Sequence, residues 1–137
     1  GYVEQGILLD GSFADINGAT VKGSSQPAIR VGSFGTPSSG STLKVRSSEV
    51  TGAGVGISAG VFGDVDIRAT KVYGHAWSPL GSPGYGISAA GPNMVIAEGS
   101  YILGDESGIR IIDPASGQLL EKESVITIDN STVEGIG

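Results

Sequence analysis

A short pattern of apolar and small residues recurs five times along the 137-residue chain. Each copy reads apolar, any, apolar, any two, small, any, apolar, and the spacing inside the unit is constant. The copies are Ala14, Ile16, Ala19, Val21; Leu43, Val45, Ser48, Val50; Val65, Ile67, Thr70, Val72; Met94, Ile96, Gly99, Tyr101; and Ile126, Ile128, Ser131, Val133. A unit that returns in this way predicts a solenoid, in which each copy packs against its neighbours.

A second pattern precedes each copy of the first. A Gly or Ala is followed by an alternating apolar stretch that begins at Ile7, Ile29, Ile57, Ile87 and Ile109. Alternation with a period of two is typical of a strand with one buried face. Each unit therefore predicts three short strands. The first starts at the Ile site and the second runs through the apolar pair. The third follows a bend at the small residue and carries the last apolar residue, which we expect to point inward.

The distance between the units defines the fold class. Successive Ile sites are 22, 28, 30 and 22 residues apart, and Gly135-Ile136 starts the next unit 27 residues later. A meander or sandwich needs tight hairpins between successive strands, and the Asn-Gly dipeptide that favours them occurs only at Asn17-Gly18. We predict a right-handed single-stranded parallel β-helix of about five coils, with 22–30 residues and three strands each. We expect one domain, 1–137, that is a fragment of a longer solenoid or has ends covered by a partner.

The aligned copies predict which residues stack. The inward columns are Ile7, Ile29, Ile57, Ile87, Ile109 and Ile16, Val45, Ile67, Ile96, Ile128. The outward columns include Asp15, Lys44, Asp66 and Asn17, Arg46, Arg68, Ala97, Asp129. Arg46 over Arg68 is unfavourable unless an acid or anion lies nearby. Two residues beyond the last apolar position stand Gly23, Gly52, Gly74 and Gly135, which predict a left-handed or strained turn.

Composition excludes several classes of function. The net charge of -6 argues against a nucleic-acid partner, because phosphate neutralisation requires a basic surface. The absence of cysteine excludes disulfides, a thiol nucleophile and zinc–thiolate sites. No run approaches the roughly 18 apolar residues of a membrane span. No motif indicates a cofactor or a metal.

Three insertions interrupt the repeat, at 32–42, 74–86 and 112–125. Loops on a rigid scaffold carry recognition, and the second insertion holds the only His and the only Trp. We therefore predict binding residues at Tyr73, His75, Trp77 and Tyr85, which are suited to stack a sugar ring or to fill a partner's pocket. The competing interpretation, which we favour for Trp77 itself, is that the indole packs over an apolar edge of the coils.

One repeat carries a family resemblance. The segment 65–74, preceded by Gly56-Ile57-Ser58-Ala59, resembles the coils of pertactin-type autotransporter passenger domains from Gram-negative bacteria. The resemblance covers nearly the whole chain. It implies a non-enzymatic adhesin or virulence stalk, secreted or held at the cell surface by a C-terminal outer-membrane barrel that this sequence lacks. A host-cell receptor or glycan is the implied partner, and end-to-end or side-by-side self-association is left open. The Arg-Gly-Asp tripeptide of pertactin is absent, so its receptor does not carry over.

The competing class is a polysaccharide-processing enzyme, since lyases, hydrolases, epimerases and phage tailspikes use the same solenoid. Glycoside hydrolysis needs two carboxylates about 5–10 Å apart. The candidates are Asp64 with Asp66, Asp105 with Glu106, Asp113, and Glu121 with Glu123. We place Asp64 at a turn and Asp66 on a strand. Because no acidic cluster repeats in register, we interpret these acids as solvated surface charges and assign no catalytic residue.

Overall fold

The computed structural model describes residues 7–9, 11–23, 27–31, 40–60, 63–77, 81, 83–112 and 124–135. Within these ranges the chain forms strands and no helix. The strands are β1 (Ile7–Leu9), β2 (Phe13–Asn17), β3 (Thr20–Lys22), β4 (Ile29–Val31), β5 (Ser41–Arg46), β6 (Glu49–Ala53), β7 (Val55–Ala59), β8 (Gly63–Arg68), β9 (Lys71–His75), β10 (Tyr85–Ala89), β11 (Asn93–Ala97), β12 (Tyr101–Gly104), β13 (Ser107–Ile111), β14 (Val125–Ile128) and β15 (Thr132–Gly135). In the part of the chain described, no helix is long and apolar enough to span a membrane.

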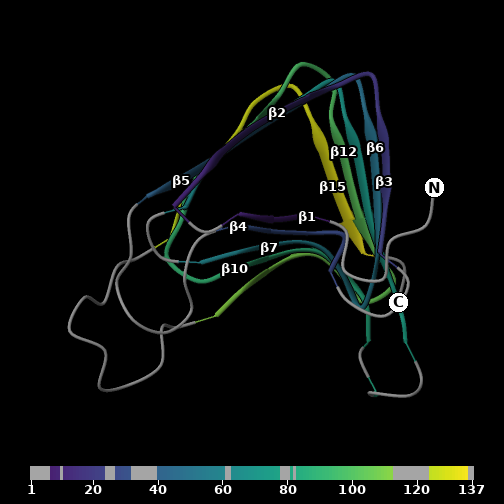
Figure 1. The fold of residues 1–137 in the computed structure, drawn as a ribbon. Coiled ribbons are helices and arrows are strands. Elements are labelled where there is room, and N and C mark those ends of the chain that lie inside the picture. Colours follow the sequence, from purple (N-terminus) through teal and green to yellow (C-terminus); the bar gives the residue numbers. More distant parts are fainter. Residues whose placement is uncertain are drawn as a thin grey trace.

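The strands form three parallel sheets of five strands each. The first sheet has the order β1-β4-β7-β10-β13, the second β2-β5-β8-β11-β14 and the third β3-β6-β9-β12-β15. Every third strand along the chain returns to the same sheet, beside the strand of the preceding triplet. The five triplets therefore stack as the coils of a parallel β-helix, which confirms the predicted fold class (Figure 1).

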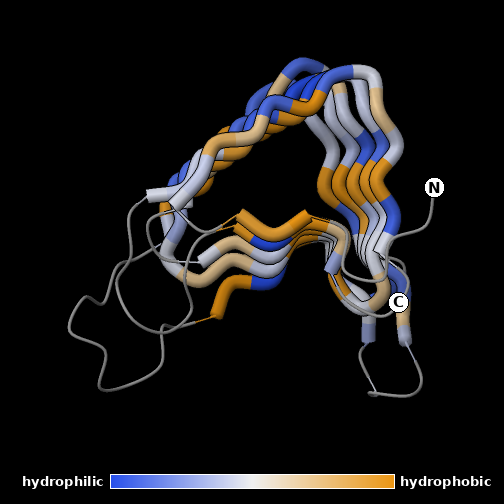
Figure 2. Tube along the Cα trace, in the orientation of Figure 1, coloured by the Kyte–Doolittle hydropathy of each residue, from blue (hydrophilic) through white to orange (hydrophobic). Residues whose placement is uncertain are grey.

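The interior of the coils is an aliphatic stack. The predicted columns pair in register, from Ile7 to Ile109 in the first and from Ile16 to Ile128 in the second. Their central members are buried as predicted, but the inward placement of Ile128 was wrong, because in the last coil this side chain is 47% exposed. Figure 2 shows the apolar positions of the third sheet aligned as a band across its strands. Branched residues stacked on like residues exclude water along the whole described core.

The fourth repeat is displaced by one residue from the predicted alignment. Ile102, not Tyr101, points inward and is completely buried. Ser100, not Gly99, occupies the bend position. Glu98 and Gly99 both have a positive φ, 57° and 75°, so this bend holds one residue more than the others. Placing Tyr101 in the core was therefore wrong, and the tyrosine lies on the outer face of the third sheet.

A ladder of hydroxyl groups runs along the bend between the second and third sheets. The N–H groups of Ala19, Ser48, Thr70 and Ser100 each donate to the hydroxyl of the bend residue one coil further on, which is Ser48, Thr70, Ser100 and Ser131 in turn. The hydroxyls of Ser48, Thr70 and Ser131 donate to the carbonyl two residues earlier in their own coil. The small residue of the repeat is thus mainly a hydrogen-bonding position.

The glycines near the ends of the third-sheet strands serve close packing. A Cβ atom on Gly52, Gly74 or Gly104 would lie 1.8, 1.7 or 1.8 Å from the carbonyl oxygen of Val55, Tyr85 or Ser107, respectively. None of these glycines has a positive φ. Of the predicted left-handed or strained turn, the left-handed form is therefore wrong at Gly23, Gly52, Gly74 and Gly135. Left-handed residues instead occupy the preceding bend, at Gly18, Ser47, Ala69, Glu98 and Asn130.

Candidate functional site

The four predicted binding residues lie near the edge where the third sheet passes into the first. Tyr73 and His75 are alternate residues of β9, and their ring centroids are 6.2 Å apart with the planes tilted by 49°. Trp77 follows β9 and is half-buried. Tyr85 begins β10, on the far side of the connection. Positions 78–80 and 82 of the predicted loop lie outside the described residues, as do 32–39 and 113–123 of the other two insertions.

Asp105 anchors this aromatic cluster from the neighbouring coil. It follows β12, and its carboxylate accepts a hydrogen bond from the Tyr73 hydroxyl at Oδ1, at 2.5 Å. Its second oxygen, Oδ2, accepts the backbone N–H of Ala76 at 2.6 Å. One carboxylate therefore fixes both the Tyr73 ring and the first residue beyond β9. From the sequence, Asp105 was only a candidate acid, and its anchoring role was not predicted.

The hydrogen bonds also define the charge states of the pair. The hydrogen bond from Tyr73, together with the Ala76 N–H and the nearby His75, lowers the pKa of Asp105 below its usual value of 3.8. The same hydrogen bond, with a contribution from burial, raises the pKa of Tyr73 to about 12. At neutral pH the pair is an ionised acceptor and a protonated donor. This arrangement favours a fixed anchor over a group that exchanges protons with a substrate.

We expect the Asp105 anchor to respond to acid. Because the folded-state pKa is lower than the unfolded value, the carboxylate stabilises the fold above the unfolded pKa, and this contribution is lost as the pH falls through the folded pKa. Asp105→Asn should lower the thermal midpoint at pH 7, and the deficit should disappear in strong acid. Glu106→Gln removes the same charge from an exposed neighbour and is the control. A deficit that is equal at both pH values would contradict the anchor.

The Tyr85 ring packs against a residue of the first sheet. The guanidinium carbon of Arg110 lies 4.7 Å from the centroid of the Tyr85 ring, a cation–π arrangement. Arg110 is a residue of β13, the strand that neighbours β10 in the first sheet. The structure thus brings together Tyr73, His75 and Asp105, with Trp77 directly following, while the Tyr85 ring stacks with Arg110.

The outer face of the second sheet offers a separate surface, a groove of about 350 Å³. Asp64 and Asp66 both line it. Asp64 lies on β8 and not at a turn, which corrects the sequence-based placement. The register places Thr42 and Asn93 beside Asp64, and Lys44 and Val95 beside Asp66.

The charged groups of this face are largely engaged with one another. Asp66 binds the Arg68 guanidinium at 2.8 Å, and the Asn93 amide donates to Asp64 at 3.3 Å. Arg46 lies 3.6 Å from Asp15, so acids do accompany the two stacked arginines. Among the residues described, no group of three His, Cys, Asp or Glu side chains is placed to hold a metal ion. The candidate acids Asp113, Glu121 and Glu123 lie outside those residues.

No family, no curated protein and no solved structure matches the chain. The functional proposals therefore rest on two surfaces, the Tyr73 cluster and the groove that Asp64 and Asp66 line.

Proposed function

We propose that this protein is a non-enzymatic adhesin-like shaft of a secreted or cell-surface protein, of the pertactin passenger type, that binds a glycan through Tyr73, His75 and Trp77. The observation that carries the proposal is the anchoring of Tyr73 and Ala76 by one carboxylate, that of Asp105. An aromatic ring held in place before the ligand arrives loses little conformational freedom on binding. Aromatic side chains also offer the flat apolar face on which a sugar ring stacks.

The scaffold supports this role because it holds the cluster without taking part in it. Val72 and Gly74 alternate with Tyr73 and His75 along β9 and are buried, so the aromatic residues project from a strand whose other face is core. β9 is paired on both sides, with β6 and β12. The position of the rings is therefore set by the stack, as expected of a rigid stalk that presents a binding surface.

A binding screen with purified protein tests the proposal. On an array of neutral and acidic glycans and on host cells, we expect Trp77→Ala and Tyr73→Ala each to weaken binding by about tenfold, the loss of one aromatic contact. Trp77→Ala should leave the thermal midpoint nearly unchanged. Tyr85→Ala, which removes a ring from the adjoining surface, is the matched control and should bind normally. Unchanged binding by both site variants would reject the proposal, and so would a large stability loss in Trp77→Ala.

The second candidate function, a polysaccharide-processing enzyme, is favoured by one observation. Asp64 and Asp66 line the same groove, and alternate strand positions are roughly 7 Å apart, within the range that glycosidases use. Release of new chain ends from a polysaccharide, lost in Asp64→Asn and Asp66→Asn, would establish this function in place of the first. Their hydrogen bonds to Asn93 and Arg68 make the binding function the better supported of the two.

A further inference from the structure

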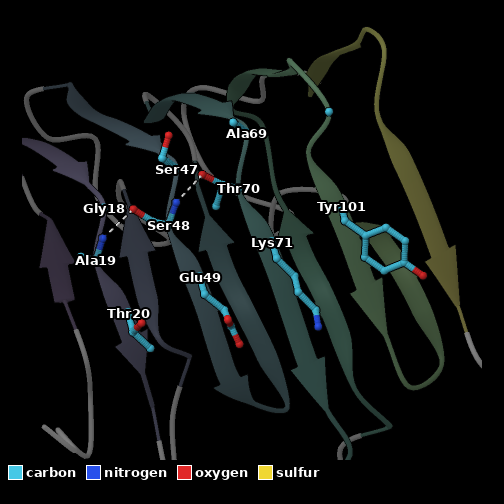
Figure 3. Close-up of a pocket in the computed structure, with 11 residues that line it drawn as sticks. Gly18, Ala19, Thr20, Ser47, Ser48, Glu49, Ala69, Thr70, Lys71 and Tyr101 are labelled. Atoms are coloured by element: carbon cyan, nitrogen blue, oxygen red, sulfur yellow. Dashed lines mark hydrogen bonds between the residues drawn. The ribbon is translucent and has the colours of Figure 1, made fainter.

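A second groove, of about 470 Å³, follows the bend between the second and third sheets. One side is lined by residues of the bend, among them Gly18, Ser47 and Ala69 (Figure 3). The other side is lined by the row that opens the third-sheet strands, which consists of Thr20, Glu49, Lys71 and Tyr101. These four residues face one another in register across four successive coils. The groove therefore runs along the axis of the β-helix.

Tyr101 is held against the sheet at one end of this row. Its hydroxyl donates to the carboxylate of Glu134 on β15, and Figure 3 shows the ring extending from β12 towards that strand. The side chain is half-buried, so part of the ring remains accessible. Tyr73 is anchored by the same diagonal relation. Each hydroxyl reaches an acid two residues beyond the residue with which its tyrosine pairs in the next strand.

Lys71, which pairs with Tyr101, and Glu49, one strand further along the row, supply opposite charges. Both are exposed, and they face each other on the neighbouring strands β9 and β6. None of the ion pairs among the described residues uses either side chain. The ammonium group of Lys71 and the carboxylate of Glu49 are thus available to donate and accept hydrogen bonds, and Thr20 adds an exposed hydroxyl.

We propose that this groove is a second saccharide subsite, which binds a neutral oligosaccharide lying along the helix axis with one sugar stacked on Tyr101. The proposal rests on the proposed glycan-binding function and extends it to a surface outside the Tyr73 cluster. A sugar has an apolar face that stacks on an aromatic ring and hydroxyl groups that donate and accept hydrogen bonds. The row offers a ring at Tyr101 and hydrogen-bonding groups at Lys71 and Glu49. An anionic sugar would pair with Lys71 but would meet Glu49 and Glu134 in a chain of net charge -6, and this disfavours it.

The test is calorimetric titration of the whole chain with oligosaccharides of glucose, of N-acetylglucosamine and of galacturonate. We expect a neutral series to bind and Tyr101→Ala to weaken it about tenfold. Tyr101→Phe keeps the ring but loses the anchor to Glu134, so we expect a smaller loss, with the fold intact. Lys71→Met should also weaken binding, whereas Tyr85→Ala should not.

The outcomes separate this subsite from the Tyr73 cluster. If Trp77→Ala and Tyr73→Ala weaken binding while Tyr101→Ala and Lys71→Met do not, the second subsite is rejected and the proposed function stands. If only the Tyr101 and Lys71 variants weaken binding, the second subsite stands and the Tyr73 cluster is rejected. Binding of galacturonate oligosaccharides alone would overturn the neutral ligand class, and binding of none of the three series would overturn the subsite.

Discussion

Gly74→Ala is expected to destabilise the protein by about 3 kcal/mol or to prevent folding. The added Cβ atom would lie 1.7 Å from the carbonyl oxygen of Tyr85 and 3.0 Å from the backbone nitrogen of Gly56. Both neighbours are backbone atoms of strands in the first sheet, so no side-chain rotation can relieve the overlap. The chain would have to move β9 away from β10, which disturbs the pairing of both strands with their neighbours.

Gly18→Ala is the matched control for this substitution. A Cβ atom on Gly18 would meet no heavy atom within 4 Å, but its φ of 67° is left-handed. Only backbone strain is then added, and we expect a loss of about 1 kcal/mol. Urea unfolding followed by circular dichroism measures both variants. If Gly74→Ala loses no more stability than Gly18→Ala, close packing is not the reason for a glycine at position 74.

The position of Gly74 also connects stability with recognition. It stands between Tyr73 and His75, so a backbone shift that accommodates a methyl group there displaces both rings. A folded Gly74→Ala protein should therefore bind the proposed glycan ligand more weakly than its remaining stability alone would suggest. The corner glycine thus helps to position the aromatic cluster.

The fold was predictable because the apolar repeat determines which residues of successive coils pair. Each inward position, such as Ile57 or Ile67, pairs with an apolar residue one coil away. The constant spacing inside the unit predicts this pairing from one sequence, without an alignment of homologues. The outward neighbours of Asp66 follow from the same register. Hydrophobic periodicity predicts such features because burial of the aliphatic columns determines the register.

The features of the candidate sites were less predictable, because they depend on contacts between coils. The extra residue at Glu98-Gly99 moves Tyr101 from the core to the surface, and an apolar pattern that accepts tyrosine does not show this displacement. The anchoring of Tyr73 by Asp105 joins residues 32 positions apart, in a turn whose register the repeat does not fix. Once the coils are aligned, each outward tyrosine can be compared with the residue that lies two positions beyond its partner in the next coil. An acid at that position, such as Asp105 for Tyr73, indicates the anchor.

The hydroxyl ladder shows the same limit, since its residues were recognised as small but not as hydrogen-bonding. Thr70 receives the Ser48 N–H at 3.3 Å and donates to the Arg68 carbonyl at 2.8 Å, and the residue is only 2% exposed. A valine has nearly the same shape but can do neither. Thr70→Val would leave the Ser48 N–H without its acceptor inside the bend, where water has little access.

We therefore expect Thr70→Val to destabilise the protein by about 2 kcal/mol, the cost of an unsatisfied buried donor. Thr132→Val makes the same chemical change at an exposed position of β15 and should alter the free energy of unfolding by less than about 0.5 kcal/mol. Amide hydrogen exchange adds a local measurement, because the Ser48 amide should lose protection in Thr70→Val. Equal stability of the two variants, with the Ser48 amide still protected, would show that the bend needs only a small residue. A loss confined to Thr70→Val would make the ladder a source of the stiffness with which the bend holds the start of the third sheet.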